Sequence, residues 1–358
     1  MAYTTIDNPE LYFQNKLYTG NGSTQSITLD GSENMSPNMV WLKIRTQAYS
    51  HRIFDSVRGA NKRIHPDTNE AEDSPTTALT SFDSDGFSLG NNTGENKSGD
   101  TFVAWNWKAG TSFSNDASST GVGSIDSTGS ISTDAGFAII SWVGTGVDAT
   151  IAHGLGSAPK IVFVKNRSTT DKWRSSFTAL DGSYDYMHLN TTESVSNEPV
   201  SAPTSSVFSV YSHAQSNGNG NNMIAYVFSE KKGYSKFSSY TGNASTTNGT
   251  FVYTGFKPAW VLTKSSSNAS TQWTLKDNKR NTFNPCNASL YPNLNAAEDS
   301  DSNIGIDFLS NGFKLYGNYS GINANGYTYI YMAFAEAPFV NSNGVPNNAR
   351  WLCSYLLT

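Results

Sequence analysis

Pairs of adjacent acids are the first residues in this chain whose types could do chemistry. They occur at two matching places, Glu72-Asp73 and Glu298-Asp299, each within a polar turn. Glycoside hydrolysis needs two carboxyls about 5–9 Å apart across a cleft. Adjacent residues of a strand point to opposite faces of a sheet, so these pairs do not meet that requirement. We interpret them as solvated turns and assign no catalytic residue.

Two aspartates just before Gly86, the second of which is Asp85, suggest a calcium loop. Calcium takes six to eight oxygen ligands, and the Glu that completes the known loop is absent here. The matching segment later in the chain carries no charge at these positions and ends in Asn311-Gly312. Asp-Gly and Asn-Gly are the preferred dipeptides of a two-residue β-hairpin turn, because its residues need positive φ. Asp85-Gly86 and Asn311-Gly312 both fit this turn. We therefore expect structural turns and no metal site.

Histidines and nucleotide-binding motifs give no further chemistry. No histidine has another at i+2 or i+4, so a zinc site has no support. The chain also lacks a nucleophile elbow, a phosphate-binding loop and a dinucleotide fingerprint. We expect no cofactor and no enzymatic activity. The scattered histidines are His51, His65, His153, His188 and His213.

Two tryptophans could stack on a sugar ring. Trp173 and Trp273 each stand 14 or 15 residues after a proline, and His51 holds the same place earlier in the chain. A half-buried side chain with a bonded ring N–H explains this recurrence equally well. The sequence favours a core or interface role, and the two tryptophans stay weak candidates for ligand binding.

An Asp is followed three residues later by an Arg at two matching places. The pairs are Asp55 with Arg58 and Asp277 with Arg280. A local ion pair or a turn hydrogen bond is the interpretation that the short spacing favours.

All of these residues belong to an internal repeat that occurs in three copies along the chain. Each copy has a proline before a short apolar strand that ends in Lys, and we expect Pro37, Pro159 and Pro258 to begin those strands, where the missing N–H removes no ladder bond. Each copy closes on an aromatic strand 64, 63 or 70 residues after its proline. The closing strands are Thr101–Trp107, Asn222–Phe228 and Thr328–Phe334.

The copies predict an all-β protein of three tandem antiparallel β-sandwich domains, jelly-roll-like and related by internal repeat. Short β-branched and aromatic runs lie between turn residues, and no capped 3.6-residue period is present. The second copy lacks the hairpin glycine, so its turn should differ. The expected parts are an N-terminal arm (1–12), copy 1 (13–110), a Ser/Gly-rich linker or β-arm (111–136), copy 2 (137–233), copy 3 (234–338) and a C-terminal tail (339–358).

Composition excludes several classes of protein. Net charge is −5 with no basic run, which disfavours nucleic-acid binding through phosphate neutralisation. The chain has no apolar run of 18 residues and no signal-peptide pattern at its start, so we expect no membrane insertion and no secretion signal. A disulfide between the two cysteines, Cys286 and Cys353, is disfavoured.

Several longer motifs resemble those of uncharacterised β-modules that recur in virion proteins of tailed bacteriophages, many of them marine. The resemblance covers the chain from about Phe13 to Arg350, and the second copy departs most from the pattern in its middle. The motifs are residues 55–59, 81–90, 104–110, 151–160, 233–243 and 331–339.

The resemblance implies a virion structural protein, made in the host cytoplasm and exposed on a tail or fibre, where it contributes to host attachment. A capsid decoration protein or head fibre is the alternative. A polysaccharide depolymerase is a third, disfavoured class, because the acid pair is missing. Expected partners are other virion proteins, a host surface glycan or protein, and further copies of the chain, with a homotrimer expected from symmetry.

Overall fold

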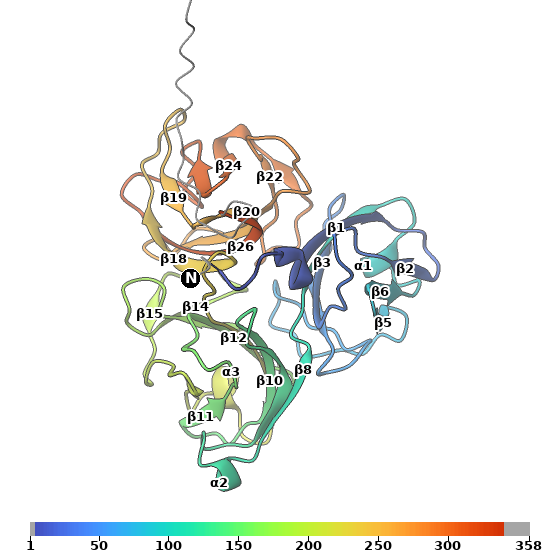
Figure 1. Ribbon diagram of the computed structural model, residues 1–358, viewed down its shortest axis with the longest axis vertical. Coiled ribbons are helices and arrows are strands. Elements are labelled where there is room, and N and C mark those ends of the chain that lie inside the picture. The colour runs from blue at the N-terminus through green and yellow to red at the C-terminus, as the bar shows by residue number, and fades with distance from the viewer. Residues whose placement is uncertain (1–3, 340–358) are drawn as a thin grey trace, which may run out of the picture.

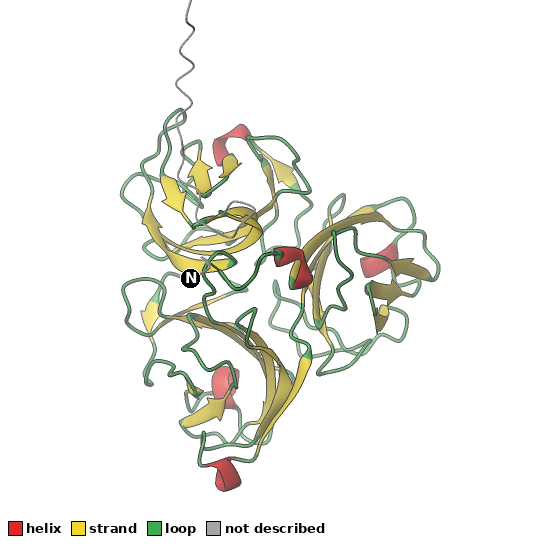
Figure 2. Ribbon diagram, viewed as in Figure 1, coloured by secondary structure: helices red, strands yellow, loops and turns green. Residues whose placement is uncertain are grey.

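The computed structural model describes residues 4–339. Strands hold 41% of the chain and helices 5%, so the protein is all-β, as the sequence predicts. The strands form three lobes around a common centre (Figures 1 and 2). We call these lobes repeat 1, repeat 2 and repeat 3, and they correspond to residues 13–110, 137–233 and 234–338.

Repeat 1 places a four-stranded antiparallel sheet toward the centre and a three-stranded sheet outside it. The short helices η1 (Pro9–Leu11), in the N-terminal arm, and α1 (Thr93–Asn96), in repeat 1, begin at Asn side chains that cap them. In spatial order the inner strands are β1 (Phe13–Thr19), β7 (Thr101–Trp107), β3 (Met39–Ile44) and β4 (Arg52–Asp55), and the outer ones are β2 (Gln25–Ile27), β6 (Gly86–Leu89) and β5 (Leu79–Asp83).

Repeat 2 uses the same inner order but extends it into an eight-stranded sheet. Its outer sheet has only two strands, and it carries the helix α3 (Ala214–Asn217). The equivalent inner strands are β10 (Phe137–Val143), β17 (Asn222–Phe228), β12 (Ile161–Asn166) and β13 (Arg174–Phe177), followed by β14 (Asp185–His188) and β15 (Ser196–Asn197), with β11 (Ala149–Ala152) and β16 (Val207–Val210) outside.

Repeat 3 returns to the pattern of repeat 1 and adds a two-stranded ribbon and a short helix, η2 (Ser302–Ile304). The inner strands are β18 (Ser235–Thr241), β26 (Thr328–Pro338), β20 (Phe256–Ser265) and β21 (Thr274–Asp277), the outer ones β19 (Phe251–Tyr253), β25 (Gly312–Leu315) and β24 (Ile306–Leu309), and the ribbon β22 (Ala288–Ser289) with β23 (Asp299–Ser300).

The inner strands are apolar on both faces because each face is covered by a different core. In β3, Met39 and Trp41 point into a core that all three repeats share, whereas Val40 and Leu42 point into a core that belongs to repeat 1 alone. Successive strand residues alternate between faces, which explains the split. Repeats 2 and 3 divide their residues in the same way between the shared core and a private one.

The three closing strands meet in the shared core at their last aromatic residue. The ring of Phe334 lies 5.6 Å from that of Trp107 and 5.9 Å from that of Phe228, centroid to centroid. Such edge-on aromatic pairs add about 0.5–1.5 kcal/mol each beyond the area they bury. Ile6 of the N-terminal arm is also buried there. The repeats are therefore not independent domains, because all three contribute to one hydrophobic core.

The segment 111–136 is a β-arm. Its strands β8 (Thr111–Asn115) and β9 (Ser127–Ser132) flank the helix α2 (Ala117–Thr120), and β9 pairs with the edge of β10. Of the two forms expected for this segment, the flexible linker is wrong. The alternating Ser130-Ile131-Ser132 pattern supplies the pairing edge.

Two details of the predicted strands and turns need correction. The hairpin between β5 and β6 pairs Asp83 with Gly86, so its loop lies one residue earlier than the expected Asp85-Gly86 turn. The loop before Gly312 is shifted in the same way, and Asn311 lies in it. A side chain at Gly86 would meet the Ile27 carbonyl oxygen at 2.0 Å, and one at Gly312 the Val252 oxygen at 2.1 Å. Close approach of the neighbouring strand thus requires both glycines, and only Gly86 has positive φ.

The three prolines do not all stand at strand starts. Pro37 and Pro159 lie just before β3 and β12. Pro258 is the third residue of β20, at an irregularity in the pairing with β26. A bulge accommodates a residue that lacks an N–H, so the proline is tolerated inside this strand.

Parts of the predictions concern residues at the chain ends. The tail (339–358), apart from Phe339, and Cys353 lie outside the described residues. Cys286 is a buried free thiol. Within residues 4–339, no helix has both the length and the apolar character needed to span a bilayer.

Candidate functional site

Equivalent backbone hydrogen bonds join the repeats pairwise, and we name the contacts junction 1–2, junction 2–3 and junction 3–1. In each, an N–H from one repeat donates to the carbonyl of another, two residues after the lysine that recurs at the end of the strand that follows the proline. The three bonds run from Glu72 to Arg167 (3.0 Å), from Val195 to Ser266 (3.1 Å) and from Glu298 to Arg45 (2.8 Å).

The recurring Trp and His residues lie at the same junctions. Trp173 Nε1 donates to the His65 carbonyl (2.8 Å) and Trp273 Nε1 to the His188 carbonyl (3.0 Å). His51 fills this place in junction 3–1, where its Nδ1 accepts from Trp41 Nε1. Burial lowers the pKa of His51 well below its usual value, and the Tyr291 backbone opposes this lowering. His51 Nε2 itself has no partner with hydrogen-bond geometry among the described residues.

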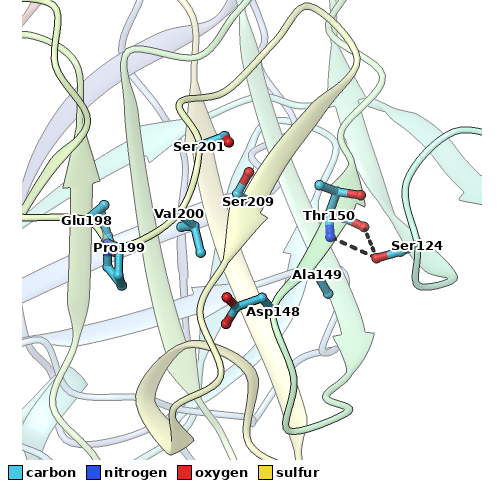
Figure 3. A pocket seen from close by; sticks show the side chains of 9 residues that line it. All are labelled: Ser124, Asp148, Ala149, Thr150, Glu198, Pro199, Val200, Ser201 and Ser209. Atoms are coloured by element: carbon cyan, nitrogen blue, oxygen red, sulfur yellow. Dashed lines mark hydrogen bonds between the residues drawn. The ribbon is translucent and has the colours of Figure 1, made fainter.

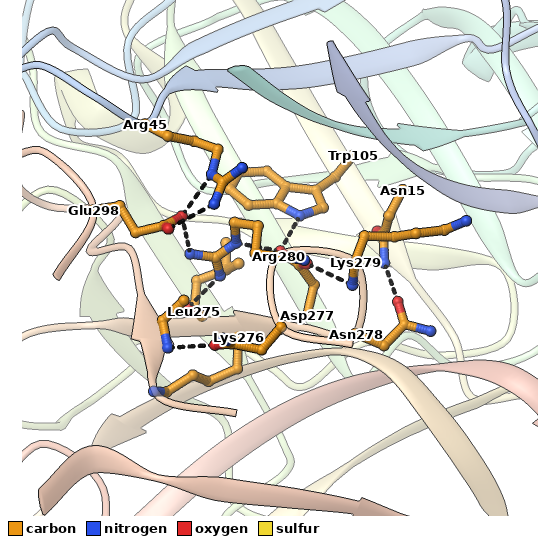
Figure 4. A network of polar contacts seen from close by, with 12 residues as sticks. Asn15, Arg45, Trp105, Leu275, Lys276, Asp277, Asn278, Lys279, Arg280 and Glu298 are labelled. Carbon is orange, nitrogen blue, oxygen red and sulfur yellow. Dashed lines mark hydrogen bonds and ion pairs between the residues drawn. The ribbon is translucent and has the colours of Figure 1, made fainter. Parts of the chain in front are cut away.

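Junction 3–1 contains a cluster of two acids and two arginines, of which Asp277 and Arg280 are fully buried and Arg45 and Glu298 partly buried (Figure 4). Arg280 Nε contacts Asp277 Oδ2 at 2.5 Å, and Trp105 Nε1 donates to the same oxygen at 3.0 Å. Arg45 binds both carboxylate oxygens of Glu298 at 2.8 Å. Although burial would raise the pKa of Glu298, the hydrogen bond from Arg45 and the charge of Arg280 lower it.

Junction 1–2 repeats this cluster with different partners. Asp55 Oδ2 accepts from Arg58 Nε (2.5 Å) and from the Tyr226 hydroxyl (2.6 Å). Arg167 Nε and Nη2 donate to the two oxygens of Glu72 at 2.8 and 3.0 Å. Burial raises the pKa of Glu72, but the Arg167 hydrogen bond and the Arg58 charge lower it overall. Both clusters are neutral as a whole, with two charges of each sign.

Junction 2–3 has no counterpart of these charges among the described residues. Phe177 stands where the other repeats have Asp55 and Asp277, and Leu180 stands in place of the arginine. Phe177 and Met332 line one small apolar gap of about 10 Å³. Val195 and Ser266 replace the Glu–Arg pair. Apolar packing thus does here what a buried ion cluster does at the other two junctions.

One buried lysine lies at each junction. Lys43, Lys165 and Lys264 are fully buried and donate to backbone carbonyls. Lys165 reaches Asn69 of repeat 1, and Lys264 reaches Thr192 of repeat 2. Burial lowers the pKa of Lys43 to about 7 and those of Lys165 and Lys264 to about 8, because few charges compensate the lost hydration.

An open groove of about 600 Å³ lies on the outer side of repeat 2 (Figure 3). It is formed where the segment after β15 faces β11 and β16, which is the part of repeat 2 that departs from the other repeats. Thr150 N donates to Ser124 Oγ at 2.9 Å, which ties the β-arm to the groove wall. The lining residues are Ser124, Asp148, Ala149, Thr150, Glu198, Pro199, Val200, Ser201 and Ser209.

The two acids of the groove are held by neighbours. Arg174 donates to both oxygens of Glu198 (2.8 and 2.6 Å), and the Arg174 guanidinium lies 3.6 Å from the Tyr186 ring centroid. Asp148 Oδ1 accepts from the Ser212 backbone (2.7 Å). The remaining lining is small, and its serines and threonine carry hydroxyl groups. The groove can therefore exchange hydrogen bonds with a hydroxyl-rich ligand.

Residues 8–338 match a family described as a domain of unknown function, DUF7483. The chain belongs to this family. The match treats the three repeats as one unit, in keeping with their shared core. Neither the curated proteins nor the solved structures contain a significant match to the chain.

The structure brings most of the recurring chemical residues together at the junctions of this family unit. Trp173 and Trp273 are 0% and 2% exposed, so neither ring offers a face to a ligand, and the interface interpretation holds. Glu72 and Glu298 are ion-pair partners whose side chains are only 12% and 16% exposed, so the interpretation of the acid pairs as solvated is wrong for these two glutamates. The local Asp–Arg pairs are confirmed.

The sequence did not identify the groove. Its lining comes from four segments of the chain, and none of these carries a motif. Divergence of repeat 2 from the other copies was the one available signal.

Proposed function

We propose that this protein is a bacteriophage virion structural protein built from three tandem β-sandwich repeats, exposed on a tail or fibre, where it contributes to host attachment. The single observation that supports a structural role is the use of the recurring residues. The repeated Trp, Asp, Arg, Glu and Lys side chains bond across junctions between repeats, and they thereby join the three repeats.

Host contact is assigned to the groove of repeat 2. Its small hydroxyl side chains and engaged acids suit the hydroxyl groups of a surface glycan. Weak contacts of this kind gain strength when many copies of a protein are displayed together. A homotrimer remains part of the proposal, and it would form through the outer loops, because the inner faces are already used within one chain.

A capsid decoration protein is the second candidate, and the threefold arrangement of the repeats favours it. A body with three similar lobes matches a threefold site on a symmetric shell. Labelled antibodies on intact virions, viewed by electron microscopy, separate the two candidates. Label on the tail supports the first proposal, label on the head supports the second, and its absence from virions overturns both.

Host contact has its own test. A Trp at Ser201 would fill the exposed rim of the groove, and purified Ser201→Trp should bind host cells at least several-fold more weakly than the unaltered protein. Ser205→Trp, on the same segment but outside the groove, is the matched control. Equal binding by both variants would remove the groove from the proposal. Release of new reducing ends from host polysaccharide by the pure protein would instead show an enzyme.

A further inference from the structure

A second hollow, of about 430 Å³, lies on repeat 3, away from the groove of repeat 2. One loop residue at its rim is unusual. Phe283 is 85% exposed, more than any other large apolar side chain in the described chain. The lining residues are Lys257, Asn278, Lys279, Asn281, Thr282, Phe283, Asn284, Cys286, Phe308 and Glu336.

The loop that carries Phe283 is an insertion. Ile64 and Leu290 are equivalent, because each bridges the inner strand of its own repeat, at Ile53 and Leu275. From Asp55 to Ile64 is nine residues (64 − 55), whereas from Asp277 to Leu290 is thirteen (290 − 277). Repeat 3 thus has four more residues here than repeat 1. The longer loop exposes the aromatic ring of Phe283 to solvent, where it does not contribute to the core.

The far wall of the hollow is a fixed row of polar groups. Glu336 accepts from Lys257 Nζ through one oxygen (2.9 Å) and from Asn278 Nδ2 through the other (2.8 Å). Phe308, 5% exposed, belongs to the private core of repeat 3 and makes an apolar floor. The wall therefore keeps its geometry without a ligand, and no large rearrangement is needed for binding.

The charge of the lining is positive. The lining carries two lysines, Lys257 and Lys279, and one acid, Glu336, which pairs with Lys257; the lysine side chains are 42% and 39% exposed. Lys279 also lies 3.5 Å from Asp30, which is 50% exposed and stands outside the hollow. An anionic group in the hollow would compete with the exposed Asp30 for the Lys279 ammonium.

We propose that this hollow binds a sugar ring that carries a carboxylate. Phe283 packs on the apolar face of the ring, Asn281 and Thr282 of the lining bond its hydroxyls, and Lys279 meets the carboxylate. The proposal depends on the hollow alone, so it stands or falls independently of where the protein sits on a virion and of the groove on repeat 2.

The test uses the full chain and two defined probes, methyl β-D-glucuronide and methyl β-D-glucoside, titrated by ligand-observed NMR. We expect the glucuronide to bind at least several-fold more tightly. Phe283→Ala should weaken both probes about tenfold. Tyr253→Ala is the matched control, because Tyr253 is an exposed aromatic (56%) of the same repeat outside the hollow, and it should change nothing.

Lys279→Gln separates the charge contribution from the stacking contribution. It should remove the preference for the glucuronide and leave glucoside binding within about twofold. Thermal unfolding of each variant verifies that the fold is unchanged, as expected for exposed side chains. Absence of binding of both probes, equal binding by Phe283→Ala, or a preference that survives Lys279→Gln would overturn the proposal.

Discussion

Junctions 3–1 and 2–3 join equivalent surfaces by opposite chemistry. At junction 3–1, Asp277 and Arg280 are fully buried and complete a four-charge cluster with Trp105 as a further donor. At junction 2–3, Phe177 and Met332 line a small apolar gap instead. The backbone hydrogen bond beside both is the same. The arrangement of the three repeats is therefore set by the sheets and the backbone hydrogen bonds, and the side chains at a junction can be either charged or apolar.

The largest expected effect comes from breaking one charged cluster. Asp277→Ala removes the closest partner of the buried Arg280 guanidinium, which keeps only the longer contact with Glu298, and it removes the acceptor of the Trp105 N–H. Removing one member of a buried ion pair typically costs about 3–5 kcal/mol. Urea unfolding should show a loss of this size, whereas Phe177→Leu at the equivalent place should cost about 1 kcal/mol. Equal losses would mean that the two junctions do not differ as described.

Converting one junction into the other tests the comparison directly. The double variant Asp277→Phe with Arg280→Leu gives junction 3–1 the residues of junction 2–3. Replacing a buried ion pair by apolar groups is often close to neutral. We expect the double variant to be at least about 2 kcal/mol more stable than Asp277→Ala in the same urea assay. A double variant as unstable as the single one would show that the cluster is needed for more than charge balance.

A change of pH should alter the stability of both kinds of junction in the same direction, because each contains a buried lysine. The pKa of Lys43 falls from its usual value to about 7, and that of Lys264 to about 8, because of burial. Between these values and about 10 the unfolded chain holds more protons than the folded one, so stability rises with pH. We expect the free energy of unfolding to increase from pH 7.5 to 9, by at most about 1.4 kcal/mol per pH unit for each lysine.

Lys264→Met and Lys43→Met should each make this pH dependence shallower. The range ends at pH 9 because the pKa of the Cys286 thiol is raised to about 11 by burial, and this works in the opposite direction above its usual value of 9. If the free energy of unfolding rises equally with pH in the unaltered protein and in both variants, the buried lysines are not the cause of the rise.

The smallest effect is expected at the rim of junction 2–3. Lys172 and Glu193 form an ion pair of 2.6 Å with side chains 38% and 48% exposed. Exposed pairs contribute about 0–1 kcal/mol and weaken with salt. Lys172→Ala should therefore change the urea midpoint little, and a loss near that of Asp277→Ala would show that exposure does not separate the two classes of ion pair.

The sequence predicted the strands and their threefold repetition, because period-two patterns and turn residues are local signals. It did not predict the shared core. A strand such as β3, apolar at Met39, Val40, Trp41 and Leu42, looks the same whether one core or two cover its faces. Glu72 was misinterpreted for a related reason, since its partner Arg167 lies 95 residues away. Pairing over such distances follows from the packing of whole repeats and leaves no local trace.

The hollow at Phe283 was equally hidden, because four inserted residues in one copy look like ordinary loop variation. The groove of repeat 2 has no motif at all. Comparison of the copies nevertheless indicated where to look, because both sites lie where one repeat departs from the others.

Covalent linkage of the three lobes has an evolutionary consequence. In an assembly of identical chains, a change in one loop appears at every lobe, so a new binding surface must be tolerated three times. Here each lobe is encoded separately, and the four residues inserted before Leu290 alter a single lobe. One gene can thus test a different surface on each lobe while the shared core is left untouched.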